Sequence, residues 1–171
     1  NRMRFDFTFS RAMTPQEVKK TEDIMNKWIG EKLPVNTDVM GIEEAKLTGA
    51  TALFGEKYED VVRVVSIGGK AKCNCGSDCS CDHESGEEKE VISKEFCAGT
   101  HASNTADLRL VKIVSEGAIA AGTRRIEAVV ADAALGYLNA KSAEIDKLAS
   151  RFKVHFDEVE PRIEKILEEN K

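Results

Sequence analysis

The chain has 171 residues, of which 42% are hydrophobic, and a formal net charge of −5. This composition is enough for one packed domain with an appendage. No run of about 18 apolar residues occurs, which argues against a membrane-spanning helix, and the first residues do not follow a signal-peptide pattern. The negative charge argues against non-specific coating of nucleic acid, although a local basic face for a specific RNA stays open. The five cysteines are an odd number without a secretion signal, which predicts a reducing compartment, so we expect a cytoplasmic protein with no membrane partner. The chain does not begin with methionine, so we also expect it to be a piece of a longer protein.

The N-terminal residues follow a strand pattern and then a helix pattern. Residues 2–9 alternate strictly, with Met3 and three phenylalanines on one face, which predicts a half-buried strand. Thr14 can cap a helix, and Pro15 suits the first helical position. Apolar residues then recur at helical spacing, which predicts an amphipathic helix over residues 15–33.

The middle of the chain predicts three strands and one short helix. The strands cover residues 34–40, 61–67 and 90–96, and the helix covers residues 42–47. Residues 68–88 are polar, glycine-bearing and rich in cysteine, so we expect a surface loop there.

The C-terminal part predicts two more strands and two helices. The strands cover residues 108–115 and 123–130 and are joined through the sequence EGAIAAG. Helical spacing begins at Ala131 and is interrupted near His155, and the two helices either pack on the domain or begin a coiled coil. Because strands and helices mix without regular βαβ alternation, the sequence predicts an α+β fold: an antiparallel or mixed sheet with packed helices, followed by C-terminal helices.

One stretch places two good zinc ligands close together. Cys97 and His101 follow the predicted strand at residues 90–96, four residues apart, and thiolate and imidazole are common zinc ligands. A lone cysteine is more often a small buried residue, so the spacing alone is weak. Thr100 and Asn104 are candidate pocket residues, with side-chain capping of the loop as an equal alternative.

A second cysteine group lies in the polar loop. Cys73, Cys75, Cys79 and Cys81 fall within nine residues, and such soft ligands suit zinc or copper(I). The alternative is an insertion without function. A thiolate metal-binding module is therefore one hypothesis for this chain.

Five separate blocks, taken together, resemble the editing domain of alanyl-tRNA synthetases. They are residues 2–7 (RMRFDF), 49–58 (GATALFGEKY), 62–65 (VRVV), 97–105 (CAGTHASNT) and 115–129 (SEGAIAAGTRRIEAV). Residues 152–171 resemble the segment that leads into the connector to the synthetase's C-terminal domain. The resemblance implies a threonyl/alanyl-tRNA synthetase editing-like fold. It also implies an N-terminally truncated editing domain over residues 1–130 and a helical connector over residues 131–171.

The resemblance also implies a reaction. Editing domains of this family hydrolyse alanine tRNA that carries serine or glycine, using zinc held by an upstream H-x3-H and a downstream C-x3-H. Cys97 and His101 match the downstream half, and we expect the upstream half to precede Asn1, so the isolated chain should be inactive or weak. Ala98 departs from the family, which usually has glycine there. ATP and magnesium would serve only the parent's catalytic domain, which attaches alanine to tRNA.

The implied partners are the acceptor end of alanine tRNA and the remainder of the synthetase. Arg124 and Arg125 are candidate contacts to tRNA phosphates, with structural ion pairs to Glu116 or Glu127 as the alternative. A tRNA-binding module without chemistry is a further hypothesis. A free-standing editing protein or a threonyl-tRNA synthetase would share the ligand pattern, and the tail after Ala131 favours the alanyl family.

Overall fold

The computed structural model describes residues 2–52, 58–70 and 89–170. The elements are β1 (Arg2–Thr8), α1 (Pro15–Gly30), β2 (Val35–Gly41), α2 (Ile42–Leu47), β3 (Val61–Gly69), β4 (Lys89–Phe96), the 3-10 turn η1 (Thr105–Leu108), β5 (Val111–Ala120), β6 (Thr123–Val130), α3 (Ala131–Phe152), the 3-10 turn η2 (Phe156–Glu158) and α4 (Val159–Glu169). They confirm the predicted α+β class. Across the described ranges, no helix has the length and apolar character needed to cross a membrane.

The chain divides into two compact units. One comprises residues 1–14 and 110–171, and the other comprises residues 15–109. The strands accordingly form two three-stranded antiparallel sheets instead of the single sheet that we expected. The boundary that we expected at residue 130 separates an editing domain from a connector and comes from the resemblance. The two compact units do not test it, so this boundary stays a prediction.

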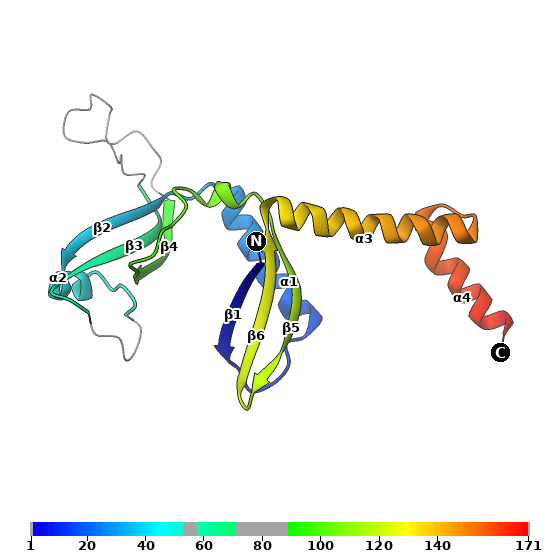
Figure 1. Cartoon of the computed structure of the whole chain (residues 1–171), viewed down its shortest axis with the longest axis horizontal. Coiled ribbons are helices and arrows are strands. Elements are labelled where there is room, and N and C mark those ends of the chain that lie inside the picture. Colours follow the sequence, from blue (N-terminus) through cyan, green and yellow to red (C-terminus); the bar gives the residue numbers. More distant parts are fainter. Residues whose placement is uncertain (1, 53–57, 71–88, 171) are drawn as a thin grey trace, which may run out of the picture. The chain divides into compact units, whose positions relative to one another are not determined.

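The first unit contains the sheet β1-β6-β5, with β6 in the middle (Figure 1). On the middle strand, Ile126 and Ala128 are buried. β5 continues to Ala120, so most of the sequence EGAIAAG is strand and not the connecting loop that we expected. A tight turn at Gly122, where φ is +71°, joins β5 to β6. Residues 108–110 precede β5, so the predicted start of that strand was wrong.

The apolar face of β1 is less covered than its alternation predicts. Met3 is 42% exposed and Phe5 is 59% exposed. Phe7 lies between Phe5 and Phe9, with ring centroids 6.1 Å from each. The prediction of a half-buried strand was therefore right for the strand and wrong for the burial of its first residues.

The C-terminal helices belong to the first unit. α3 follows β6 directly and contacts both β5 and β6, and α4 contacts α3. Ala134 and Ala149 are the buried residues of α3, whereas four large apolar side chains of this helix stay exposed: Leu135, Leu138, Ile145 and Leu148.

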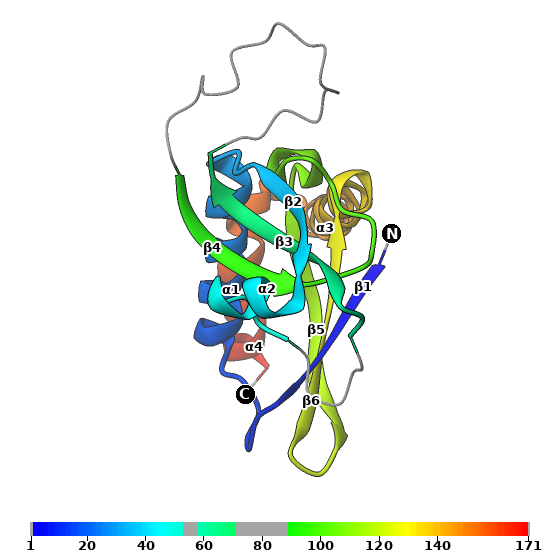
Figure 2. The same cartoon turned by 90° about the vertical axis from the view of Figure 1, so that its left-hand side faces the viewer.

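The second unit contains the sheet β2-β3-β4. Figure 2 shows β3 between its two neighbours, which explains its almost continuous burial. Ala45, Val62, Val64 and Phe96 form the buried cluster. Tyr58 packs edge-on against Phe96, with ring centroids 5.1 Å apart. Because Phe96 is the last residue of β4, this cluster fixes the strand end that precedes Cys97.

Candidate metal centre

The loop after β4 is held at its beginning by backbone hydrogen bonds. The Phe96 N–H donates to the Thr51 carbonyl at 3.0 Å, and the Cys97 N–H donates to the Arg63 carbonyl at 3.1 Å. The Arg63 guanidinium also donates to the Ala98 carbonyl at 3.1 Å. Strands β3 and β4 therefore fix the position of Cys97 although it lies outside both.

The far end of the same loop is held by side chains. The Asn104 side-chain oxygen accepts from the Ala106 N–H at 2.8 Å, and its amide nitrogen donates to the Lys32 carbonyl at 3.0 Å. Asn104 thus caps η1, which is the structural alternative that the sequence left open. A pocket role for Asn104 stays a prediction, as does one for Thr100, which lies exposed in the loop.

Three potential ligands converge where β4 passes into this loop. The ligand atoms of Glu95, Cys97 and His101 all lie within 4.8 Å of one another. A Cβ atom built on Gly99 would lie 3.6 Å from the Cys97 Sγ and 3.9 Å from the His101 Cε1, so both side chains fold around this glycine. The structure therefore brings the predicted Cys97 and His101 together, and their sulfur and nitrogen donors suit zinc.

Sequence reasoning missed Glu95. The available signal was its spacing, since residues two apart on a strand point to the same side, and Glu95 precedes Cys97 by two. A groove of about 550 Å³ runs along β4 beside this glutamate. It is lined by Thr48, Gly49, Thr51 and five consecutive residues of β4 that end at Glu95.

Comparison with known proteins identifies the family of the chain that carries this site. Residues 62–127 match the family model of the threonyl and alanyl tRNA synthetase second additional domain. Over 171 residues, all of this chain, it is 43% identical to the alanine–tRNA ligase of Synechococcus sp. (strain RCC307). This chain is a segment from the alanyl-tRNA synthetase family. It covers 17% of the length of that relative.

Two further relatives give the same assignment. The alanine–tRNA ligase of Synechococcus sp. (strain JA-3-3Ab) is 42% identical over 163 residues, which are 95% of this chain and 16% of that relative. The chloroplastic/mitochondrial alanine–tRNA ligase of Populus trichocarpa is 40% identical over 169 residues, which are 99% of this chain and 15% of the relative. The resemblance to alanyl-tRNA synthetases, taken from five sequence blocks, is thereby confirmed.

The two arginines proposed to meet tRNA both form ion pairs in the first unit. Arg124 donates two hydrogen bonds to Glu116, one of them 2.8 Å from Nη2 to Oε2, and the two side chains are only 14% and 10% exposed. Hydrogen bonding from Arg124 lowers the pKa of Glu116, while burial opposes the shift and the arginine's charge adds to it. Arg124 is thus fixed in the sheet.

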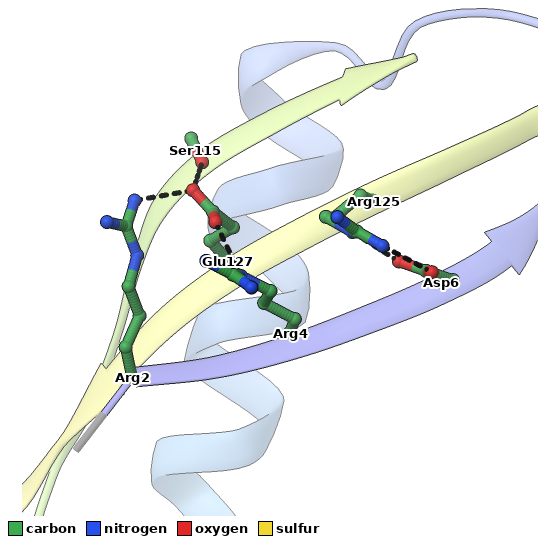
Figure 3. A network of polar contacts seen from close by, with 6 residues as sticks. All are labelled: Arg2, Arg4, Asp6, Ser115, Arg125 and Glu127. Carbon is green, nitrogen blue, oxygen red and sulfur yellow. Dashed lines mark hydrogen bonds and ion pairs between the residues drawn. The ribbon is translucent and has the colours of Figure 1, made fainter. Parts of the chain in front are cut away.

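Arg125 lies in a more exposed network that spans β1, β5 and β6 (Figure 3). Its Nε and Nη2 donate to the Asp6 carboxylate at 2.6 and 2.8 Å. Beside it, the Glu127 carboxylate accepts from the Ser115 hydroxyl at 2.9 Å and from Arg4 at 3.2 Å. Hydrogen bonding from Ser115 is the main cause of the lowered pKa of Glu127. Contacts of either arginine with tRNA stay a prediction.

The second predicted metal site lies outside the described residues. Cys73, Cys75, Cys79 and Cys81 fall within residues 71–88, so metal binding by this cluster stays a prediction.

Proposed function

We propose that this chain is the editing part of an alanine–tRNA ligase, where it hydrolyses alanine tRNA that carries serine or glycine. The observation that supports the proposal is the convergence of Cys97 and His101 at the end of β4, inside the segment that matches the second additional domain. Because the chain is much shorter than its relatives, attachment of alanine to tRNA with ATP and magnesium would be a property of the longer enzyme.

An enzyme that attaches alanine to tRNA has a physical need for a second, hydrolytic site. A binding pocket discriminates weakly against one added hydroxyl group, and a smaller amino acid also fits a pocket built for a larger one. A second, hydrolytic site removes the products of these errors. A zinc ion bound there would orient the aminoacyl group or polarise its ester.

The residues of this chain would serve that site in separate ways. Cys97 and His101 would bind the ion, and Arg63 and Asn104 hold the two ends of their loop. The groove beside β4 would give the aminoacyl end of the tRNA a place next to the ligands. The other partners would be the acceptor stem and the remainder of the synthetase.

We expect a cytoplasmic enzyme, while the relatives from Populus trichocarpa and Arabidopsis thaliana are named chloroplastic/mitochondrial. Zinc chemistry of this kind is compatible with either location.

A chimeric synthetase tests the proposal. This chain would replace the matching segment of the Synechococcus sp. (strain RCC307) enzyme, to which it is 43% identical, and hydrolysis of serine-charged alanine tRNA would be measured. We expect the chimera to hydrolyse the mischarged tRNA and the Cys97→Ala chimera to lose nearly all of this activity, because the thiolate ligand is gone.

Two controls make the result decisive. Attachment of alanine should be equal in both chimeras, which shows that the rest of the enzyme is intact. The isolated 171-residue chain should hydrolyse poorly, because its sequence contains no H-x3-H pair to complete the family's ligand set. Equal hydrolysis of mischarged tRNA by the wild-type and Cys97→Ala chimeras would contradict the proposed function.

A further inference from the structure

Glu95 is the one member of the converging group that the family's C-x3-H pattern does not include. We propose that Glu95 is a third protein ligand, so that this chain by itself holds a zinc ion through one oxygen, one sulfur and one nitrogen. The inference rests on the zinc part of the proposed function and extends it to a ligand set that does not need the upstream histidines.

The strand geometry delivers Glu95 to the site. Glu95 and Cys97 point to the same side of the chain at the end of β4, whereas Phe96 between them is 5% exposed and packs in the core. Backbone pairing fixes this register. Glu95 lies opposite Val65 of β3, and Thr51 bridges it from the other side.

The distances suit a four-coordinate ion after small side-chain movements. Bonds of about 2.0–2.3 Å to zinc place tetrahedral ligand atoms roughly 3.4–3.8 Å apart. The three ligand atoms already lie within 4.8 Å of one another, so no pair needs to close by more than about 1.5 Å. Glu95 and His101 are both exposed, and rotation of their side chains can supply this movement.

The charges also fit. A thiolate and a carboxylate bring two negative charges to a divalent ion, and a neutral imidazole adds none. Among the residues that the structure describes, no side chain forms a hydrogen bond or ion pair with the Glu95 carboxylate. Glu95 can therefore turn toward an ion without breaking another interaction.

Zinc titration of variants tests this assignment. All proteins would carry serine in place of Cys73, Cys75, Cys79 and Cys81, because those thiolates would bind the same metal. Affinity would be measured by competition with a chromophoric chelator. We expect one zinc per chain and a loss of about 100-fold in affinity for Glu95→Ala, since even residues outside the ligand shell contribute about 10–100-fold.

A matched control lies on the same strand. Glu90 is an exposed glutamate of β4 outside the converging group. Glu90→Ala should therefore bind zinc with the same affinity as the four-serine protein that carries no further substitution. Glu95→Cys gives a positive test in the cobalt(II)-loaded protein. If position 95 is in the ligand shell, its new thiolate should raise the sulfur-to-cobalt charge-transfer band about twofold, from one thiolate to two.

Three results would overturn the assignment: no zinc bound by the four-serine protein, equal zinc affinities of Glu95→Ala and Glu90→Ala, or no increase in the cobalt band of Glu95→Cys. These results are separable from failure of the proposed function. Zinc that is lost with Cys97→Ala but kept with Glu95→Ala would remove Glu95 from the site and leave the editing proposal to the chimera experiment.

Discussion

Thr105 shows how single side chains support the candidate site. It is buried, and its hydroxyl donates to the Trp28 carbonyl and accepts from the Leu33 N–H, both at 2.8 Å. Its own N–H donates to the Leu33 carbonyl at 2.9 Å. These bonds attach the end of α1 to η1, directly after the loop that carries His101.

Removal of this hydroxyl should destabilise the second unit. Thr105→Val keeps the shape of the side chain and leaves the Leu33 N–H and the Trp28 carbonyl without a partner, so we expect the free energy of unfolding to fall by about 2 kcal/mol. Urea unfolding followed by the fluorescence of Trp28, the single tryptophan of the chain, measures the change. Thr105→Ser keeps the hydroxyl and should lose less, and equal losses would show that the hydrogen bonds contribute nothing.

The Glu116–Arg124 pair should make stability depend on pH. The pKa of Glu116 lies below its ordinary value of 4.5, chiefly because Arg124 donates hydrogen bonds to the carboxylate. A carboxyl group with a lowered folded-state pKa stabilises the protein fully above the unfolded pKa. That stability is lost as the pH falls from 4.5 through the lowered value.

Thermal unfolding of wild type and Glu116→Gln checks this expectation. The Tm of wild type should exceed that of Glu116→Gln near pH 7, and the difference should shrink as the pH falls to about 3. A difference that stays constant across this range would show that the pair does not titrate with folding. Glu160→Gln, at an exposed position of α4, serves as the control.

At the scale of elements, the β3–β4 pair depends on a glycine that has no room for a side chain. The register of this pair shifts between Ile67 and Gly69. Gly68, in the shift, has φ of +102°, and a Cβ atom there would lie 2.0 Å from the Glu90 carbonyl oxygen. The close approach of the two backbones explains why this position requires glycine.

The neighbouring glycine provides a matched comparison. Gly69 also has a positive φ, +74°, but a Cβ atom there would make an ordinary contact of 3.5 Å with Val91. Gly69→Ala should therefore lower the free energy of unfolding by about 1 kcal/mol through backbone strain alone, and Gly68→Ala by about 3 kcal/mol or more. Similar losses in urea unfolding would argue that β4 moves aside freely.

At the scale of the molecule, the three converging side chains of the candidate metal centre belong to one unit. Residues 15–109 are continuous in sequence and contain Glu95, Cys97 and His101, together with their own buried cluster. The strands of the other unit come from both sides of this segment. The second unit therefore has the organisation of an insertion between β1 and β5.

We expect residues 15–109 to fold when expressed alone, because the buried cluster around Val64 and Phe96 is contained in this range. Cooperative urea unfolding detected by Trp28 fluorescence would confirm this. The same fragment with Val64→Asp places a charge at a side chain that is 2% exposed, and it should fail to fold. Non-cooperative unfolding of the unmodified fragment would contradict the expectation.

Most elements could be predicted from the sequence because their patterns are local. Period-two alternation located β1, and capping residues located the start of α1. The pairing of Cys97 with His101 was also a local signal, since four residues separate them. The errors arose where a strand depends on residues distant in the sequence. The predicted strand at residues 108–115 ended too early, because Gly117 and the alanines after it belong to β5 only through pairing with β6.

What the sequence by itself determined is the α+β class, most of the elements and the C-x3-H half of a zinc site. The tertiary structure decided the partners: two sheets instead of one, Asn104 as a cap, Arg124 and Arg125 in ion pairs, and Glu95 beside the cysteine. The physical reason is range. Backbone preferences repeat over two to four residues, whereas contacts such as Thr51 with Glu95 join residues far apart in the chain, and only the folded chain brings them together.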